Sequence, residues 1–313
     1  MLRYIAIRFA TAIPVLFLVV LLIFALLRLT PGDPAILIAG DGASPAQLEA
    51  IRANLRLNEP LPTQLLAWLG DLARLDLGTS VFSGRPVTSL IAQRIEPTLM
   101  LAITTTLLAV LIATPLGALA AYRARTGLDR GVIMFSVAGF SVPVFVVGYV
   151  LIYLFAIQLR WFPVQGYKPL AGGFWACVHS IALPSLALSF LFIGLIARVT
   201  RATMLEVLSE DYIRTARAKG ALTPRVLLVH ALKNVGPPVM TVVGIGFAGL
   251  LGGVVVTETV FNIPGMGRLT ADAILQRDYP VVQGVMLTFS LMLIGVNLLV
   301  DLTYPFFDPR IRY

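Results

Sequence analysis

The sequence predicts an all-α integral membrane protein that crosses the bilayer about six times. Of its 313 residues, 58% are hydrophobic and only 13% are charged, with a mean hydropathy of +0.88. Soluble globular domains do not have this composition. The apolar residues also gather in stretches of roughly 20, the length needed to span a bilayer. These stretches lie at about 9–28, 98–121, 131–157, 181–200, 237–257 and 281–304.

The first apolar stretch is interpreted as a transmembrane helix rather than a cleaved signal peptide. It is too long for the apolar region of a signal, and no small-x-small site precedes the PGDP sequence at 31–34. The net charge of +8 does not indicate nucleic-acid binding, because no basic run is interleaved with aromatic residues. One cysteine, Cys177, and two distant histidines, His179 and His230, predict neither a disulfide framework nor a metal site.

The distribution of Lys and Arg predicts that both termini are cytoplasmic. Cytoplasmic loops of membrane proteins are enriched in these residues. Here they are concentrated between the second and third stretches and between the fourth and fifth: Arg123, Arg125 and Arg130, then Arg198, Arg201, Arg214, Arg217, Lys219, Arg225 and Lys233. The opposite short loops hold few: Arg160 and Lys168, then Arg268 and Arg277.

The chain therefore divides into four parts. Residues 1–28 are an N-terminal segment with the first transmembrane helix, and 29–97 form a helical cap outside the membrane. Residues 98–304 are a five-helix core with a cytoplasmic loop at 201–236, and 305–313 are a cytoplasmic tail. In the cap, the capping box that runs from Ser44 to Gln47 predicts the start of one helix, Pro60 and Pro62 end it, and a second short helix follows.

Small residues at helical spacing predict close helix packing in the second and fifth spans. They include Ala109, Ala113 and Gly117 in the second span and the pair Gly249 and Gly253 in the fifth. Such residues let helix backbones approach closely in lipid, so these two spans are expected to be interior. The alternative is that Gly and Ala are merely common in membrane helices. Pro115, Pro143 and Pro184 lie inside their spans and are expected to kink them.

The chain shows no internal means of using energy. None of its lysines, Lys168, Lys219 and Lys233, stands in a GxxxxGK[ST] phosphate-binding loop, so any ATPase must be another chain. The spans lack nucleophile–base pairs and metal clusters, so no catalytic, cofactor or metal residues are expected. They also hold essentially no mid-membrane acidic residues, since Glu258 and Asp301 fall near span ends. This argues against coupling to proton or sodium gradients.

The long cytoplasmic loop reads as helix, sharp turn, helix. Leu205, Leu208 and Tyr212 follow helical spacing, Gly220 suits a helix end, and Thr223-Pro224 suits the start of the next helix. With Ala216 and Ala218 small and its flanks basic, the first helix is suited to docking into a groove on a partner. The alternative is a basic helix lying on anionic lipid.

Several motifs resemble one family over nearly the whole chain. The sequence EDYIRTARAKG at 210–220, with HALKN at 230–234, is similar to the coupling-loop signature of ABC importer permeases of the dipeptide/oligopeptide/nickel family, first-permease type. The same likeness holds for PGDP at 31–34, DLG at 76–78, TETVFNIPGMG at 257–267, RDYP at 277–280 and DPRIR at 308–312. ABC importers generally carry Glu-Ala-Ala, three residues and Gly in this loop. Here Arg214, Thr215, Ala216 and Gly220 take those places, a departure typical of the peptide branch.

The resemblance implies the type I ABC importer permease fold, with a coupling helix seated in an ATPase subunit. Its residues are Asp211, Tyr212, Ile213, Arg214, Thr215, Ala216, Arg217, Ala218, Lys219 and Gly220. It also implies an outer gate on the translocation path at Glu258, Asn262, Pro264, Gly265 and Gly267. Pro264 and the two glycines have the turn chemistry of a tight re-entrant loop. Glu258 alternatively is only an interfacial carboxylate.

The implied assembly sits in the bacterial inner membrane. It comprises a second permease subunit as a heterodimer, two ATP-binding subunits that carry ATP and Mg, and an external substrate-binding protein. The implied substrate is a dipeptide or oligopeptide, favoured by family frequency. Nickel complexes and glutathione remain alternatives, although the sparse methionines and the lack of histidine in the spans give no positive sign of nickel. A secondary transporter or a channel is the alternative outside this family.

Overall fold

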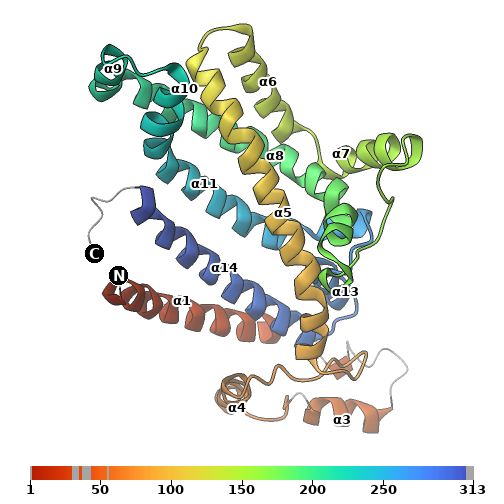
Figure 1. Ribbon diagram of the computed structural model, residues 1–313. Helices are drawn as coiled ribbons and strands as arrows, with labels where there is room; N and C mark the ends of the chain where they lie inside the picture. The colour runs from red at the N-terminus through yellow and green to blue at the C-terminus, as the bar shows by residue number, and fades with distance from the viewer. Residues whose placement is uncertain (1, 30–34, 37–43, 55, 308–313) are drawn as a thin grey trace. The chain divides into compact units, whose positions relative to one another are not determined.

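The computed structural model describes residues 2–29, 35–36, 44–54 and 56–307, and their regular structure is helical (Figure 1). The PGDP and DPRIR motifs lie outside the described residues. The α-helices are α1 (Leu2–Leu29), α3 (Pro45–Asn54), α4 (Leu61–Ala73), α5 (Val87–Tyr122), α6 (Gly127–Ser141), α7 (Val144–Leu151), α8 (Phe174–Ser209), α9 (Asp211–Ala218), α10 (Thr223–Arg225), α11 (Leu232–Gly253), α12 (Val255–Val260), α13 (Met266–Leu275) and α14 (Tyr279–Phe307). Two π-helical segments, η1 (Ile152–Gln158) and η3 (Val226–Ala231), and one 3-10 turn, η2 (Leu170–Gly172), complete the order.

Each of the six predicted spans falls on helix. Four helical stretches of the described chain are long and apolar enough to cross a membrane: Val87–Tyr122, Phe174–Ser209, Thr223–Gly252 and Tyr279–Thr303. The bent pair Gly127–Ser141 and Val144–Gln158 makes a fifth if it counts as one span. The first predicted span lies within α1, where Ala10–Ala25 is a shorter apolar helix.

Proline affects the spans unequally. Helices α5 and α8 run through Pro115 and Pro184 without interruption. Pro143 instead separates α6 from α7, and the two helices are bent by 103°. Proline at the residue before a helix is compatible with that helix but cannot donate to the helix that has just ended. The third predicted span is therefore broken rather than kinked.

The chain forms two compact units. The first comprises residues 97–264 and the chain from 293 onward, and the second comprises residues 2–96 and 265–292. In the first unit α8 packs against α6 on one side and α11 on another (Figure 1). Of the most apolar 18 residues of α8, 67% are buried, against 28% for α5 and 44% for the stretch that contains α11. Among the four unbroken stretches long enough to span a membrane, the fourth predicted span is thus the most buried, which the small-residue pattern did not predict.

The small residues of α5 lie where α5 packs closely on α8. Ala109 and Ala113 are fully buried in the same apolar cluster as Ile196 and Ala197 of α8. A Cβ atom at Gly117 would lie 2.6 Å from the backbone oxygen of Ala197, closer than real contacts allow. Gly249 of α11 has open space where its Cβ would be, and the surroundings of Gly253 are outside what the structure describes. Their packing role remains a prediction.

The second unit contains the two short helices predicted for the 29–97 segment. The first, α3, ends at Asn54 and not at Pro60 and Pro62 as predicted, because these prolines stand at the start of α4, where a missing N–H is tolerated. The capping box is present, with the Gln47 side chain accepting from the Ser44 backbone N–H at 2.9 Å and the Ser44 hydroxyl accepting from the Gln47 N–H at 3.3 Å. Trp68, Leu69 and Leu72 of α4 pack on Val20 and Ile23 of α1. That this segment lies outside the membrane stays a prediction.

The segment that follows α4 is fixed to the turn between α13 and α14. Asp278 is buried and accepts hydrogen bonds from the Ser80 hydroxyl and from the Val81 N–H, the latter at 3.2 Å. An isolated antiparallel bridge joins Thr79 to Pro86. Asp278 belongs to the RDYP motif, and its partners Ser80 and Val81 come shortly after the DLG motif. The two motifs therefore meet at one contact, which the sequence did not reveal.

Replacing Asp278 with alanine should loosen this loop. The change leaves the buried Ser80 hydroxyl without its acceptor, which costs roughly 1–3 kcal/mol, and it also removes the acceptor of the partly buried Val81 N–H. We expect faster limited proteolysis within 78–86 of the purified protein. Asp272→Ala, at a half-exposed carboxylate in the same unit, is the control and should leave the cleavage rate unchanged. Equal cleavage of the Asp278 variant and the wild type would contradict the anchoring role.

Candidate functional site: the predicted coupling helix and a buried carboxylate

The predicted coupling helix is α9, a separate element at the C-terminal end of α8 (Figure 1). Its bounds, Asp211–Ala218, agree closely with the sequence-based range. Helix α8 ends at Ser209, and Glu210 takes an extended conformation with φ −68° and ψ 147°, which separates the two helices. Asp211 lies in the first turn and Arg217 in the last, the placement that favours the helix dipole.

The turn after α9 requires glycine geometry. Gly220 has φ +83°, in the left-handed region, and its N–H donates to the carbonyl of Arg217 at 2.9 Å. The Ala221 N–H donates to the carbonyl of Ala216 at 3.1 Å, which closes the helix end. The sequence predicted Thr223 as the N-cap of the next helix. In the structure Leu222 is the N-cap and Thr223 is the first helical residue, so the helix begins one residue earlier. After three residues it continues as the π-helical η3 into α11.

One apolar side chain anchors α9 while the rest of the helix stays accessible. Ile213 is fully buried in the cluster that contains Met204, Val207 and Val226. The Tyr212 hydroxyl accepts a hydrogen bond from the Asn234 side chain. Ala216 is half-buried, and the remaining residues are exposed: Asp211, Tyr212, Arg214, Thr215, Arg217, Ala218, Lys219 and Gly220. Ile213 thus attaches α9 to the rest of the protein, and the other side of the helix presents a mainly polar surface.

A cavity lies beside α9. It has a volume of about 260 Å³ and is lined by Tyr122, Arg217, Ala221, Thr223, Val226 and Leu227. The hydroxyls of Tyr122 and Thr223 are 3.3 Å apart at its wall. The end of α5 thus contributes to the same surface as the loop.

The gate residues predicted from the sequence lie in α12 (Glu258), in the turn that follows it (Asn262, Pro264 and Gly265) and in the first turn of α13 (Gly267). Glu258 is fully buried, and its Oε1 accepts from the Thr98 hydroxyl of α5 at 2.7 Å. The left-handed residue of this turn is Asn262, with φ 50°, whereas Gly265 is extended and serves as the N-cap of α13. Pro264 is exposed, and Gly265 and Gly267 are buried. Glu258 is thus enclosed by protein atoms of its own chain, and its role at a gate stays a prediction.

A further buried carboxylate was not singled out by the sequence. Asp129, in the first turn of α6, is 2% exposed and forms a two-pronged ion pair with Arg201 of α8. In the sequence, Asp129 is the one acidic residue among the basic residues that follow the second span. Those basic residues were used only to assign the orientation of the chain. Because the two partners are 72 positions apart, no local spacing in the sequence indicates the pair.

Comparisons with known proteins identify the family. The pattern described as "binding-protein-dependent transport system inner membrane component" matches residues 113–313, and its N-terminal counterpart matches residues 1–102. The chain belongs to this family of binding-protein-dependent transport permeases. It is 52% identical to a probable peptide ABC transporter permease protein of Sinorhizobium fredii, over 99% of each chain. It is also 44% identical to the glutathione transport system permease protein of Escherichia coli, over 100% of each.

The fold is also that of a solved permease. An inward-facing structure of the MetNI methionine ABC transporter matches 71% of this chain and 97% of its own, with a TM-score of 0.56 and 17% identity. That likeness shows the type I ABC permease fold. As a permease of this family the chain is a multi-pass inner-membrane subunit of an ABC importer, and it works with an ATPase and a substrate-binding protein. Its relatives are transport permeases rather than enzymes.

Proposed function

We propose that this permease forms the path for short peptides and receives its driving force through α9. The observation that carries the proposal is the form of α9: an exposed polar helix, fixed by Ile213 at its base and closed by a glycine turn. A helix that must transmit a rigid displacement needs such an anchor more than it needs reactive groups. ATP and Mg would bind the partner ATPase subunits.

Relatives support the choice of substrate. The relative in Sinorhizobium fredii is named for peptide transport, and it shares about half of its residues with this chain over nearly the full length. The full-length similarity to permeases named for glutathione supports glutathione as the second candidate. Both ligands are peptide-like, so one uptake assay with competing ligands separates them.

We further propose that the working complex holds a second, different permease and two ATP-binding subunits, with both termini of this chain cytoplasmic. The exposed small residues of α11 support the second permease, since Gly249 and Gly252 have open space that a helix of that subunit can fill. The basic residues around the start of α6 and in and after α9 support the orientation. The gate is proposed at Glu258, Asn262, Pro264, Gly265 and Gly267.

The docking role of α9 can be tested by crosslinking. Cys177 is the only cysteine and is buried, so a cysteine placed at Lys219 gives an almost clean background. We expect Lys219→Cys to crosslink to the ATPase subunit in the assembled complex, with a yield that changes when ATP is bound. Leu111→Cys, on an exposed apolar position of α5, is the control and should give no such product. Crosslinking of α9 only to lipid-linked reagents would favour a membrane-surface helix instead.

Glu258→Gln tests the gate. The substitution keeps the shape and an acceptor for Thr98 but removes the charge, so it should lower uptake of peptides that have a free amino terminus. A lost hydrogen bond to a charged group costs roughly 1.5–3 kcal/mol, so the drop should be about tenfold or more. An N-acetylated peptide of the same sequence is the control and should be affected less. Equal uptake of both peptides by variant and wild type would remove Glu258 from the gate.

A further inference from the structure

We infer that Asp129 and Arg201 are positioning residues, which join the α5–α6 turn to the coupling loop so that a displacement of α9 moves α6 and α8 as one body. The inference rests on the proposed function of α9. It assigns a role in energy coupling to two residues that touch neither the proposed docking surface nor the gate.

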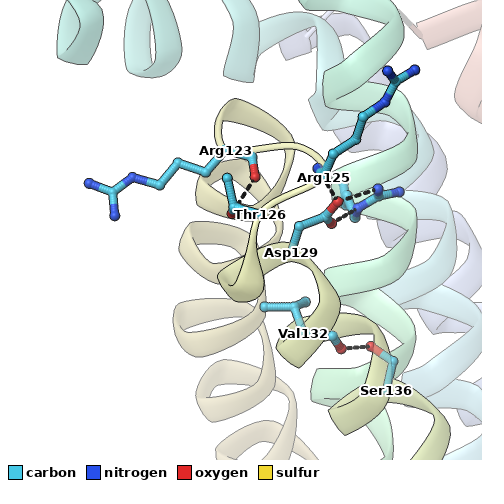
Figure 2. Close-up of polar contacts among 7 residues, drawn as sticks. Arg123, Arg125, Thr126, Asp129, Val132 and Ser136 are labelled. Atoms are coloured by element: carbon cyan, nitrogen blue, oxygen red, sulfur yellow. Dashed lines mark hydrogen bonds and ion pairs between the residues drawn. The ribbon is translucent and has the colours of Figure 1, made fainter.

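The ion pair is tightly built. Both nitrogens of the Arg201 fork reach Asp129: Nε donates to Oδ1, and Nη2 donates to Oδ2 at 2.8 Å. Oδ2 also accepts the backbone N–H of Arg125 at 2.8 Å. The Arg125 and Arg123 side chains extend away from the carboxylate, so only the Arg125 backbone is used (Figure 2). A planar fork on a carboxylate fixes orientation as well as distance.

The Arg125 contact ties the pair to a strained turn. Arg125 has φ +65°, a left-handed conformation that is costly for a residue with a side chain. The Thr126 hydroxyl donates to the Arg123 carbonyl at 2.6 Å within the same turn (Figure 2). Asp129 therefore holds the turn after α5, the start of α6 and the C-terminal part of α8 in one arrangement.

Below the ion pair, α6 and α8 are packed backbone to backbone. A Cβ at Gly194 would lie 2.9 Å from the Cα of Ser136, and a Cβ at Gly139 would lie 3.0 Å from the backbone oxygen of Phe190. The guanidinium of Arg198 stacks over the Phe140 ring at 5.6 Å. Interfaces packed this closely slide or bend little, so they transmit movement.

The two ends of this body reach the predicted coupling helix and the predicted gate. At one end Arg201 lies on the same helix as Met204, which shares an apolar cluster with Ile213 of α9. At the other end α7 contacts α12, where a Cβ at Gly148 would be 3.1 Å from the Phe261 ring. The Gly166 N–H also donates to the Phe261 carbonyl at 2.9 Å.

A purely stabilising role is the competing explanation, and a neutral double variant separates the two. Removing one partner of a buried pair leaves an unpaired charge, whereas neutralising both is often tolerated. In Asp129→Asn/Arg201→Met, asparagine still accepts from the Arg125 N–H, but the rigid fork is gone. The complex with its ATPase and binding-protein partners would be reconstituted in vesicles, and melting temperature, ATP hydrolysis and peptide uptake measured.

We expect Asp129→Asn alone to have a lower melting temperature and lower peptide uptake than the wild type. The double variant should have a melting temperature close to that of the wild type, but its uptake should stay low. Peptides taken up per ATP hydrolysed should remain about 5- to 150-fold lower than in the wild type, the usual range for lost coupling between sites. Asp71→Asn, in an exposed ion pair with Arg56, is the control and should match the wild type.

Recovery of uptake together with melting temperature in the double variant would overturn the positioning role. So would normal uptake in Asp129→Asn. If the wild-type complex itself shows no peptide uptake with ATP, the proposed function fails, and this inference fails with it for a different reason than the double variant would give. The two results are therefore distinguishable.

Discussion

Gly220→Pro and Ala216→Glu are both expected to abolish peptide uptake while leaving a folded permease in the membrane. Proline fixes φ near −65° and lacks an N–H, but Gly220 has φ +83° and donates to Arg217. The helix end must therefore rearrange. The strain is local, about 1–3 kcal/mol against the roughly 5–15 kcal/mol that stabilises a folded domain. Ala216→Glu adds a charge on the half-buried side of α9 and should disturb seating in the ATPase.

The measurement is ATP hydrolysis and uptake by the same reconstituted complex. Both variants should hydrolyse ATP at a rate that no longer responds to the loaded binding protein. Gly220→Asn is the matched control, because asparagine adopts a left-handed φ more readily than other residues with a side chain, a Cβ at Gly220 meets nothing within 4 Å, and the N–H is retained. We expect it to keep most of the wild-type uptake. Normal uptake by Gly220→Pro would contradict the assignment of α9 as the coupling helix.

Gly117→Val should have the largest effect on folding. A side chain at Gly117 would run into Ala197 and Thr200 of α8 at 2.6–2.7 Å, and part of that contact is backbone. Helix α8 is also held by α6 and α11, so it has no room to retreat. Overpacking of this kind costs typically 1–3 kcal/mol and occasionally more. We expect little monodisperse protein after detergent extraction and a melting temperature lowered by several degrees, measured by size-exclusion chromatography and thermal melting.

Gly131→Val is the control for this effect. Gly131 is an exposed position within α6, and a Cβ there meets nothing within 4 Å. Both substitutions place the same β-branched residue in a helix, so the propensity change is matched. If the two variants extract and melt alike, close packing of α5 on α8 is not what Gly117 provides.

Local patterns predicted most of this fold. Runs of apolar residues located the spans, the side chains of Ser44 and Gln47 marked the start of α3, and Gly220 marked the end of α9. Each signal lies within a few residues of the feature that it specifies, so sequence spacing is enough to read it. The family resemblance was likewise carried by short motifs, and the relatives confirm it.

Features that depend on contacts across the fold were not predictable in this way. Asp129 and Arg201 are 72 residues apart, and Thr98 and Glu258 are 160 apart, so neither pair has a sequence spacing to recognise. The burial of α8 comes from having helices on several sides, a property that its own residues do not encode. Pro143 was noted, but the difference between a kink and a 103° break depends on what α7 packs against.

The π-helical segment η3 shifts the angular phase between the coupling loop and α11. An α-helix turns about 100° per residue, and a π-type turn accommodates one residue more than an α turn. A helical wheel drawn continuously from Thr223 to Gly252 is therefore misaligned by about 100° beyond Ala231. Scanning mutagenesis of this helix should therefore use a new helical wheel that starts at Leu232. A continuous wheel would confuse the positions that face lipid with those that face the translocation path.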